Sequence, residues 1–397
     1  MITREEIRQL AEIESPKGCA ITFYFQPQTP QDKSHRQEAI LVKDLVRETL
    51  RKAERNGNDM ALREDLQRIL QIAEGLHGNH SRGKAIFACR AQGIWRELDV
   101  PPHLGESQII VNSRFHLKPL VAARTGVPRT CIALVDRKRA RIFELIEDAL
   151  MQKPDLEFAP LPKVGKSDGY GGYDAGHRER HHDNEVVANF KLFAESLQLL
   201  MKQDKCEQLL GGCRDEAWSE IEPQLHNYVK QRLVGRFLLD PIAATADEVR
   251  EYAIRILNKH RSEEQQVLVR EAIGQSQRNS RGAVGLRHVL NALERQEVQM
   301  LLVARDFHSE AVECINCKHL DTRMVESCAV CGNKTRELRD VSDALVDLAL
   351  RNGAEIRFVD RDPELEKAGR VGALLRYRAD QNTAEKVAVE GNSLTGS

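Results

Sequence analysis

Four cysteines near the end of the chain have the spacing of a metal site. The pattern is C-x2-C-x10-C-x2-C with Gly332 after the second pair, and its members are Cys314, Cys317, Cys328 and Cys331. Four thiolates suit tetrahedral Zn²⁺, and four sulfurs leave the ion no open position for water. The pattern therefore predicts structural zinc, and a pair of redox dithiols is the alternative.

The second candidate site is the glycine-rich stretch KSDGYGGYDAGHRERHH at residues 166–182. Glycines lose much backbone entropy on ordering, and the stretch offers little to a core, so a partner outside the chain is expected to order it. Aromatic rings can stack on RNA bases while cations meet phosphates. The candidate RNA-binding residues are Lys163, Lys166, Tyr170, Gly171, Gly172, Tyr173, Arg178 and Arg180. A disordered surface loop is the alternative interpretation.

Two weaker groups of residues lie in the same half of the chain. His177, His181 and His182 have a spacing that binds metal on some helices, but no third ligand follows at an obvious spacing, so a polar helix start is the alternative. The basic turn at residues 136–139, together with Arg141, can contact an RNA backbone or can simply be a solvated hairpin turn.

Composition limits the class of protein. Lys plus Arg (59) and Asp plus Glu (60) nearly cancel over 397 residues, so RNA binding has to come from local clusters of charge. No apolar run reaches the roughly 18 residues that a membrane span needs, and the charged N-terminus has no signal-peptide core. The five cysteines outside the CxxC pairs lie in or beside apolar runs, which indicates buried thiols. We expect a cytoplasmic protein with no membrane contact.

The elements that must position these sites can be read from periodicity. Single helices are predicted at 3–13, 184–203 and 343–353, the first with a capping box from Thr3 to Glu6. A two-helix hairpin is predicted over 34–76, with its tip at 55–59. Predicted strands are 18–27, 83–90, 107–115, a hairpin at 130–147, 206–213, 298–307 and 354–362. We predict an α/β (α+β) chain of three domains at 1–123, 124–242 and 243–382, followed by a disordered tail at 383–397.

Three stretches carry a resemblance to a known family. GALLRYRAD (372–380), with the segment 283–307 before it, resembles the last domain of the archaeo-eukaryotic class-one peptide release factors and their closing LRYR strand. Archaeal members carry a cysteine-pair zinc insert in the same place. The segments 97–120 and 130–145 resemble the end of the family's first domain and the hairpin that opens its middle domain. The resemblance covers roughly residues 18 to 380 and implies a release-factor-like architecture with a zinc knuckle in the third domain.

The resemblance implies a role for each domain. In the family the first domain enters the decoding site, the middle domain extends a Gly-Gly-Gln loop into the peptidyl-transferase centre, and the third domain docks a translational GTPase. Here the hairpin tip has Asn56, Gly57, Asn58 and Asp59 in place of the stop-codon motif Asn-Ile-Lys-Ser. The loop has Gly171, Gly172 and Tyr173 in place of Gly-Gly-Gln.

These departures predict binding without termination. By the resemblance, the chain is a monomeric ribosome hibernation factor of the family's bacterial branch, which contacts rRNA of both subunits in the A site with elongation factor Tu at its third domain. It is then not an enzyme. The alternative is a rescue factor that hydrolyses peptidyl-tRNA with the Gly171 and Gly172 backbone, and tRNA cleavage by the middle domain is a third possibility.

Overall fold

The computed structural model describes residues 3–15, 18–26, 36–56, 60–75, 83–100, 106–124, 128–146, 149–158 and 172–379. The fold is mixed α/β, as predicted. Its contacts divide the chain into two compact units: residues 1–126 together with 265–397 form the first, and residues 127–264 form the second. The three domain limits stay predictions. The tail expected to be disordered lies outside the described residues.

An antiparallel sheet at the start of the chain has the strand order β3-β2-β1-β4. The strands are β1 (Ala20–Phe25), β2 (Gly83–Cys89), β3 (Ile94–Val100) and β4 (Gln108–Asn112). β1 is buried along its whole length because it lies in the interior of this sheet. β3 was not predicted: its charged residues at 96, 97 and 99 conceal the alternation that identifies a strand.

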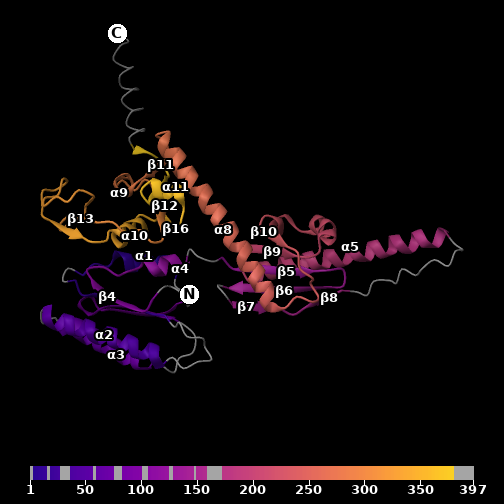
Figure 1. Cartoon of the computed structure of the whole chain (residues 1–397), viewed down its shortest axis with the longest axis horizontal. Helices are drawn as coiled ribbons and strands as arrows, with labels where there is room; N and C mark the ends of the chain where they lie inside the picture. The colour runs from indigo at the N-terminus through magenta and orange to yellow at the C-terminus, as the bar shows by residue number, and fades with distance from the viewer. Residues whose placement is uncertain are drawn as a thin grey trace, which may run out of the picture. The chain divides into compact units, whose positions relative to one another are not determined.

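The predicted helical hairpin is confirmed as α2 (Arg36–Asn56) and α3 (Met60–Gly75), which lie side by side along this sheet (Figure 1). Its apolar stripe, including Val46 and Leu66, packs on Ile21 and Phe23 of β1. Helical spacing of the apolar residues therefore identified both helices and the face that they bury.

The opposite face of the same sheet belongs to a second core that it shares with the C-terminal part of the chain. Tyr24 and Phe87 point to this side and meet edge to face, with ring centroids 6.0 Å apart. Helix α1 (Arg4–Glu12) contributes Ile7 and Leu10, and its N-terminus is held by the predicted capping box of Thr3 and Glu6. Helix α4 (Lys118–Arg124) completes this N-terminal contribution.

The C-terminal part of this unit is a sheet of strand order β11-β17-β12-β16. The strands are β11 (Gly282–Val284), β12 (Val298–Ala304), β16 (Glu355–Val359) and β17 (Val371–Leu375), and the helices are α9 (Leu286–Glu294), α10 (Ser342–Arg351) and α11 (Pro363–Lys367). Only β12 and β16 are parallel. The closing strand was predicted to include LRYR, but β17 ends at Leu375, before Arg376 to Arg378.

The second unit is built on a mixed sheet of order β10-β9-β5-β6-β7, with β8 paired to β6. Its strands are β5 (Thr130–Val135), β6 (Arg139–Ile146), β7 (Ala149–Gln152), β8 (Leu156–Glu157), β9 (Gln208–Gly212) and β10 (Leu233–Phe237). The short helices α6 (Asp215–Ile221) and α7 (Asn227–Lys230) lie between β9 and β10 in the chain. Helix α8 (Ala246–Gln277) follows, and its early residues Val249 and Ala253 join a core of this unit.

The long helix α5 (Gly172–Gln203) packs Val186, Phe190, Phe193 and Leu197 on the β5–β6 hairpin. The predicted start at residue 184 is wrong, because the helix begins twelve residues earlier. Residues 172–183 lack the apolar stripe that marks a helix in sequence, so their polar turns gave no periodic signal. Figure 1 shows α5 running well past the strands of its own unit.

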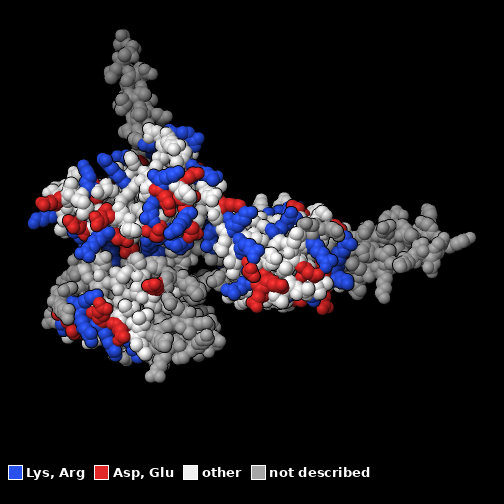
Figure 2. All heavy atoms as spheres, in the orientation of Figure 1, with Lys and Arg blue, Asp and Glu red and all other residues white. Residues whose placement is uncertain are grey.

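Charge is mixed on the molecular surface. Basic and acidic side chains are interspersed over the described residues on the face drawn in Figure 2, in keeping with the formal net charge of −1. Among the described helices, none has both the length and the apolar composition needed to cross a membrane.

Candidate metal centre

The four cysteines of the metal-site pattern lie on a small three-stranded sheet that we call the cysteine insert (residues 311–338). Its strands are β13 (Ala311–Cys314), β14 (Leu320–Asp321) and β15 (Thr335–Leu338), in the order β14-β13-β15. Cys314 ends β13, and an isolated bridge between Ser327 and Lys334 closes the second knuckle. The insert therefore brings two CxxC turns together from either side of one short antiparallel sheet.

The sulfur atoms converge as a tetrahedral site requires. All four Sγ atoms lie within 4.8 Å of one another, with Cys314 Sγ to Cys331 Sγ at 3.4 Å and Cys317 Sγ to Cys328 Sγ at 3.6 Å. A tetrahedral ion with Zn–S bonds of about 2.3 Å separates its sulfurs by about 3.8 Å. No disulfide joins them. The donor set and its spacing thus fit zinc, as the sequence predicted, and the structure itself holds no metal.

Hydrogen-bond donors point at the sulfurs. The backbone N–H of Cys317 donates to Cys314 Sγ and that of Val330 to Cys328 Sγ, each at 3.4 Å. The Asn333 amide donates to Cys331 Sγ at 3.4 Å, and it lowers the pKa of the Cys331 thiol to about 5. Donors of this kind favour thiolates, which are the form that binds metal.

A metal bound at this centre would have a structural role. Cys314, Cys317, Cys328 and Cys331 would hold Zn²⁺ through four sulfurs, so no coordination position is left for a water or a substrate. Zinc bound there would supply folding energy to the insert, because its small sheet has little core of its own. Cys314 and Cys328 are buried, while Cys317 and Cys331 are exposed.

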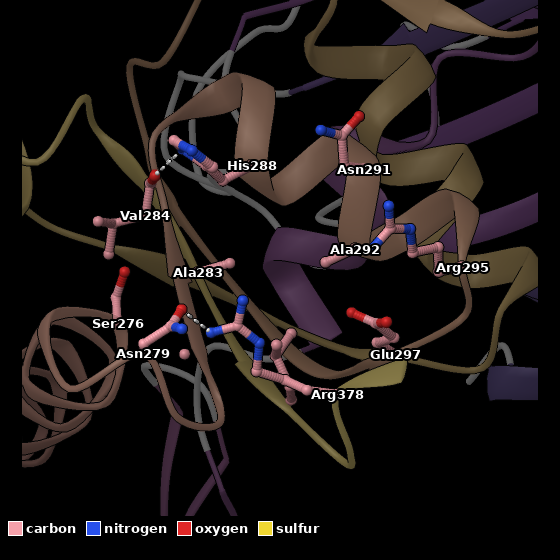
Figure 3. A pocket seen from close by; sticks show the side chains of 12 residues that line it. Ser276, Asn279, Ala283, Val284, His288, Asn291, Ala292, Arg295, Glu297 and Arg378 are labelled. Carbon is pink, nitrogen blue, oxygen red and sulfur yellow. Dashed lines mark hydrogen bonds between the residues drawn. The ribbon is translucent and has the colours of Figure 1, made fainter. Parts of the chain in front are cut away.

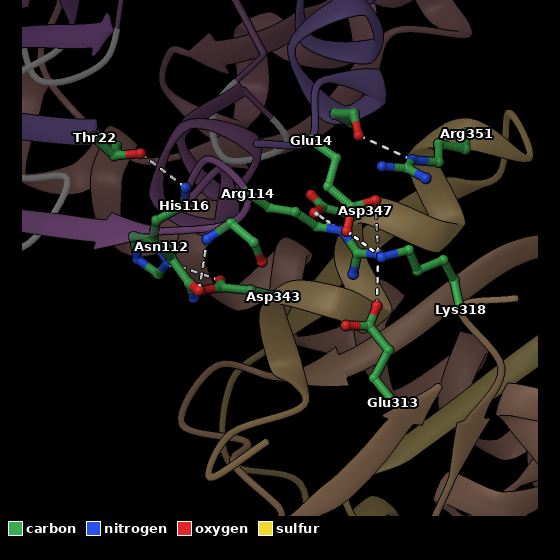
Figure 4. A network of polar contacts seen from close by, with 12 residues as sticks. Glu14, Thr22, Asn112, Arg114, His116, Glu313, Lys318, Asp343, Asp347 and Arg351 are labelled. Carbon is green, nitrogen blue, oxygen red and sulfur yellow. Dashed lines mark hydrogen bonds and ion pairs between the residues drawn. The ribbon is translucent and has the colours of Figure 1, made fainter. Parts of the chain in front are cut away.

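A cluster of charged residues beside the insert was not predicted; we call it the junction network (Glu14, Arg114, Glu313, Lys318, Arg336 and Asp347). Glu313 directly precedes the first cysteine and is almost fully buried, with 1% of its side chain exposed. Its Oε1 is 2.5 Å from an amino nitrogen of Arg114, and its Oε2 accepts from Arg336 Nε at 2.8 Å. Lys318 donates to Glu14 Oε1 at 2.5 Å (Figure 4).

These contacts join the insert to the beginning of the chain. Arg336 also donates to Ser113 Oγ at 3.0 Å, and Arg351 of α10 donates to the carbonyl of Ala11 at 2.9 Å. Burial raises the pKa of Glu14, but the hydrogen bond from Lys318 and the charge of Arg114 outweigh it, so the pKa is lowered. The junction network thus contains three cationic side chains and three carboxyl groups.

Two carboxyl groups of α10, those of Asp343 and of the network residue Asp347, face the same region. His116 Nδ1 lies 2.7 Å from Asp343 Oδ1, next to the edge of the N-terminal sheet (Figure 4). Asp347 is buried, and neither of its carboxylate oxygens has a hydrogen-bond partner among the described residues. Its nearest cation in the junction network, Arg114 Nε, is 4.0 Å away. Burial therefore raises the pKa of Asp347 well above its ordinary value.

Only some of the candidate RNA-binding residues of the glycine-rich stretch lie within the described residues. Gly172 and Tyr173 are the first residues of α5, and Arg178 and Arg180 follow on its next turns. These four were expected in a loop before the helix, and the structure corrects that expectation. Tyr170, Gly171, Lys163 and Lys166 lie outside the described residues.

The hairpin-tip candidates lie between α2 and α3. Asn56 is the last residue of α2, whereas Gly57, Asn58 and Asp59 are outside the described residues. Met60 opens α3. The predicted tip is therefore placed between two helices, as the sequence indicated, and its own conformation is not described.

The basic turn of the middle unit has structural partners. Arg137 is 2.5 Å from Glu220, and Arg139 donates to the carbonyl of Ile242 at 3.1 Å. Arg141 donates to the carbonyl of Ala244 at 2.7 Å. Arg139 and Arg141 thus hold the segment that leads into α8, whereas Arg137 pairs with α6. All three guanidinium groups have partners within their own unit.

A pocket of about 290 Å³ opens at the edge of the C-terminal sheet (Figure 3). Arg378 crosses it and donates to Asn279 Oδ1 at 2.5 Å, and Glu297 accepts from the backbone N–H of Ala379 at 3.0 Å. The lining residues are Ser276, Asn279, Gly282, Ala283, Val284, His288, Asn291, Ala292, Arg295, Glu297, Leu375 and Arg378. These bonds anchor the residues that follow β17.

Comparison with known proteins shows which protein family this chain resembles. Residues 116–258 match the model of a family described as bacterial archaeo-eukaryotic release factor family 10. The chain is therefore similar, over these residues, to release-factor-like proteins of the bacterial branch. This confirms the resemblance that the sequence showed.

Curated relatives of this release-factor-like protein are archaeal. It is 26% identical over 241 residues to peptide chain release factor subunit 1 of Thermococcus kodakarensis, covering 52% of this chain and 57% of the relative. It is 25% identical over 279 residues to the same factor of Thermococcus onnurineus, covering 62% and 64%. The matches thus span about three-fifths of the length of these relatives.

Solved structures show weaker similarity to the release-factor-like chain. The archaeal translation termination factor aRF1 is 15% identical with a TM-score of 0.25, covering 95% of this chain and 99% of the factor. Pelota of Archaeoglobus fulgidus is 12% identical with a TM-score of 0.36, covering 95% and 93%. With TM-scores below 0.5, these likenesses add no weight to the assignment.

Proposed function

We propose that this release-factor-like protein binds the bacterial ribosome in the A site and blocks it, as a hibernation-type factor, without reading a stop codon or releasing peptide. The observation that carries the proposal is the family match over residues 116–258 combined with Tyr173 where the family has the glutamine of Gly-Gly-Gln. The match supports a middle domain of the type that reaches toward peptidyl-tRNA. The tyrosine argues against hydrolysis there.

The physical reason is space. Hydrolysis of the peptidyl ester needs a water beside the ester carbon and a donor for the developing negative charge. A tyrosine ring is much larger than a glutamine amide and takes the volume that this water needs. The length of α5 beyond its sheet fits a role in carrying residues 171–173 into a narrow RNA cavity (Figure 1).

The start of α5 also supports the alternative function, which is rescue of stalled ribosomes by peptidyl-tRNA hydrolysis. Gly172 and Tyr173 are the first two helical residues, and the first N–H groups of a helix have no partner within it. Such N–H groups carry partial positive charge and bind anions. A backbone donor at this point could stabilise an oxyanion even without glutamine.

The two other parts of the chain are assigned by the same proposal. The α2–α3 hairpin would lie near the decoding centre with the segment 56–59 at its tip, and the absence of Asn-Ile-Lys-Ser there removes stop-codon reading. The C-terminal sheet would dock a translational GTPase, for which elongation factor Tu is the bacterial candidate. Zinc in the cysteine insert would keep that part folded.

The test uses ribosomes with a labelled peptidyl-tRNA in the P site, and it scores bound protein and released peptide in one tube. We expect stoichiometric binding and no release, and we expect Tyr173→Gln to gain release. Absence of cosedimentation at physiological salt refutes the proposal. Release by the natural chain that Gly172→Ala abolishes would establish the rescue function instead, and a nicked tRNA on a denaturing gel would establish cleavage.

A further inference from the structure

The cysteine insert holds the beginning of the chain by residues that adjoin its metal ligands. Glu313 is the residue before Cys314, and Lys318 is the residue after Cys317. Glu313 binds Arg114, and Lys318 binds Glu14, each with an N to O distance of 2.5 Å. The first knuckle is therefore flanked by one carboxylate and one ammonium group that both reach into the N-terminal segment.

The position of Lys318 depends on the fold of the knuckle. Its backbone N–H donates to the carbonyl of Cys314 at 3.2 Å, which closes the turn, and its φ of 63° is in the left-handed region. A residue with a Cβ is strained in this region, so the turn persists only where other interactions maintain it. Four thiolates converging on one ion would supply such an interaction.

The partners on the N-terminal side are well ordered in the fold. The N–H of Ser15 donates to the carbonyl of Ser113 at 2.7 Å, which ties the residue after Glu14 to the residue before Arg114. The side chains of Glu14 and Arg114 are largely buried, with 22% and 12% exposed. The Arg114–Glu313 pair is therefore shielded from bulk water, and the Lys318–Glu14 pair is partly exposed at its lysine, which is 36% exposed.

We propose that the cysteine insert is a metal-dependent clamp, in which metal bound to the four cysteines fixes Glu313 and Lys318 so that they hold the segment around Glu14 and Arg114. Loss of the metal releases the Lys318 turn and loosens this hold, while the apolar core shared by the two segments remains. The inference does not rest on ribosome binding, because it concerns the isolated protein.

The first test is hydrogen exchange of the purified full chain before and after zinc is removed with a chelator. We expect faster amide exchange in peptides covering residues 10–15 and 108–117. Peptides from β12 and β16 of the same unit, and from β5 and β6 of the other, are the internal controls and should not change. Unchanged exchange in residues 108–117 after complete zinc removal overturns the proposal.

The second test measures zinc binding by the folded protein, so it tests the clamp even if the zinc-free protein unfolds. Coupling is reciprocal, so a weaker clamp must also weaken metal binding. Glu14→Gln removes the negative charge opposite Lys318 without touching a cysteine, and we expect it to raise the Kd for zinc about five-fold, which equals about 1 kcal/mol. The matched control is Glu12→Gln, since Glu12 is exposed and pairs only weakly with Arg8 at 3.8 Å.

Competition with a chromophoric chelator gives both zinc affinities on one scale. An increase in Kd for Glu14→Gln alone supports the clamp. Equal Kd values for Glu14→Gln, Glu12→Gln and the natural chain overturn it, whatever the exchange data show. Failure of the ribosome-binding experiment would leave both results unaffected, so the two proposals fail separately.

Discussion

Arg114 is the residue at which the junction network can be tested for its contribution to stability. It lies 2.5 Å from the buried carboxylate of Glu313, 3.8 Å from Glu14 and 4.0 Å from Asp347. Arg114→Met keeps much of the volume and removes the charge. Glu313 then retains only Arg336, and Asp347 loses its nearest cation in the network.

The expected cost follows from desolvation. Removing one partner of a buried ion pair destabilises a protein by about 3–5 kcal/mol, because the remaining charge is buried without compensation. Since Arg336 still binds Glu313 Oε2, the lower end of this range applies, and we expect a loss of about 3 kcal/mol in the free energy of unfolding. At about 2–4 °C per kcal/mol for a unit of this size, Tm falls by roughly 6–12 °C.

The assay is urea unfolding followed by tryptophan fluorescence. The chain has two tryptophans, Trp95 in β3 of the first unit and Trp218 in α6 of the second. A Trp218→Phe background therefore reports the first unit alone, and a Trp95→Phe background reports the second unit, in which the control variant is measured. The control is Arg137→Met, which removes an exposed pair with Glu220 in the other unit and should change stability by less than about 0.5 kcal/mol.

A double variant identifies the cause. Arg114→Met with Glu313→Leu replaces the pair by apolar groups, and we expect it to recover at least about half of the loss, because no unpaired carboxylate remains at residue 313. If Arg114→Met costs no more than Arg137→Met, or if the double variant is less stable than Arg114→Met, the explanation by buried charge is wrong.

Three further outcomes are expected. Purified protein should carry one zinc per chain by elemental analysis, and Cys331→Ser should lose it; full retention of zinc by this variant would contradict the four-cysteine site. The pKa of Asp347 is raised in the folded protein, so its contribution to stability is present below the unfolded pKa of about 3.9 and is lost as pH rises through the folded pKa. The stability of Asp347→Asn relative to the natural chain, measured by urea unfolding, should therefore increase as pH rises above about 4, and a difference that does not change with pH would contradict this. Gly369→Ala should lower the free energy of unfolding by about 1–2 kcal/mol, because φ is 94° and the added Cβ would lie 3.2 Å from Gly285 Cα; an unchanged urea midpoint would contradict this.

The sequence predicted the parts of the structure in which residues of one type stand at a characteristic spacing. The α2–α3 hairpin followed from apolar residues at helical spacing, and the metal centre followed from four cysteines whose spacing alone defines two knuckles. In both cases the signal is contained in one short segment, so no knowledge of distant contacts was needed.

The features that sequence reasoning missed depend on distant contacts or on polar turns. Glu14 and Lys318 are 304 positions apart, and each is an ordinary charged residue until the fold brings them together. The first turns of α5 are polar on all sides, so they were assigned to the glycine-rich segment before the helix. Glu313, in a short strand beside a cysteine, offered one local signal: a charge at an expected core position requires a partner.

The central strand β1 belongs to two cores at once. Ile21 and Phe23 face the helical hairpin, whereas Ala20 and Tyr24 face the core that includes Leu345 of α10. A fragment that ended at residue 126 would expose the second face, with Tyr24 and Phe87, to water as an aggregation-prone apolar surface. Residues 1–126 therefore should not fold as an independent module. Fusion proteins that carry them without the last third of the chain should aggregate.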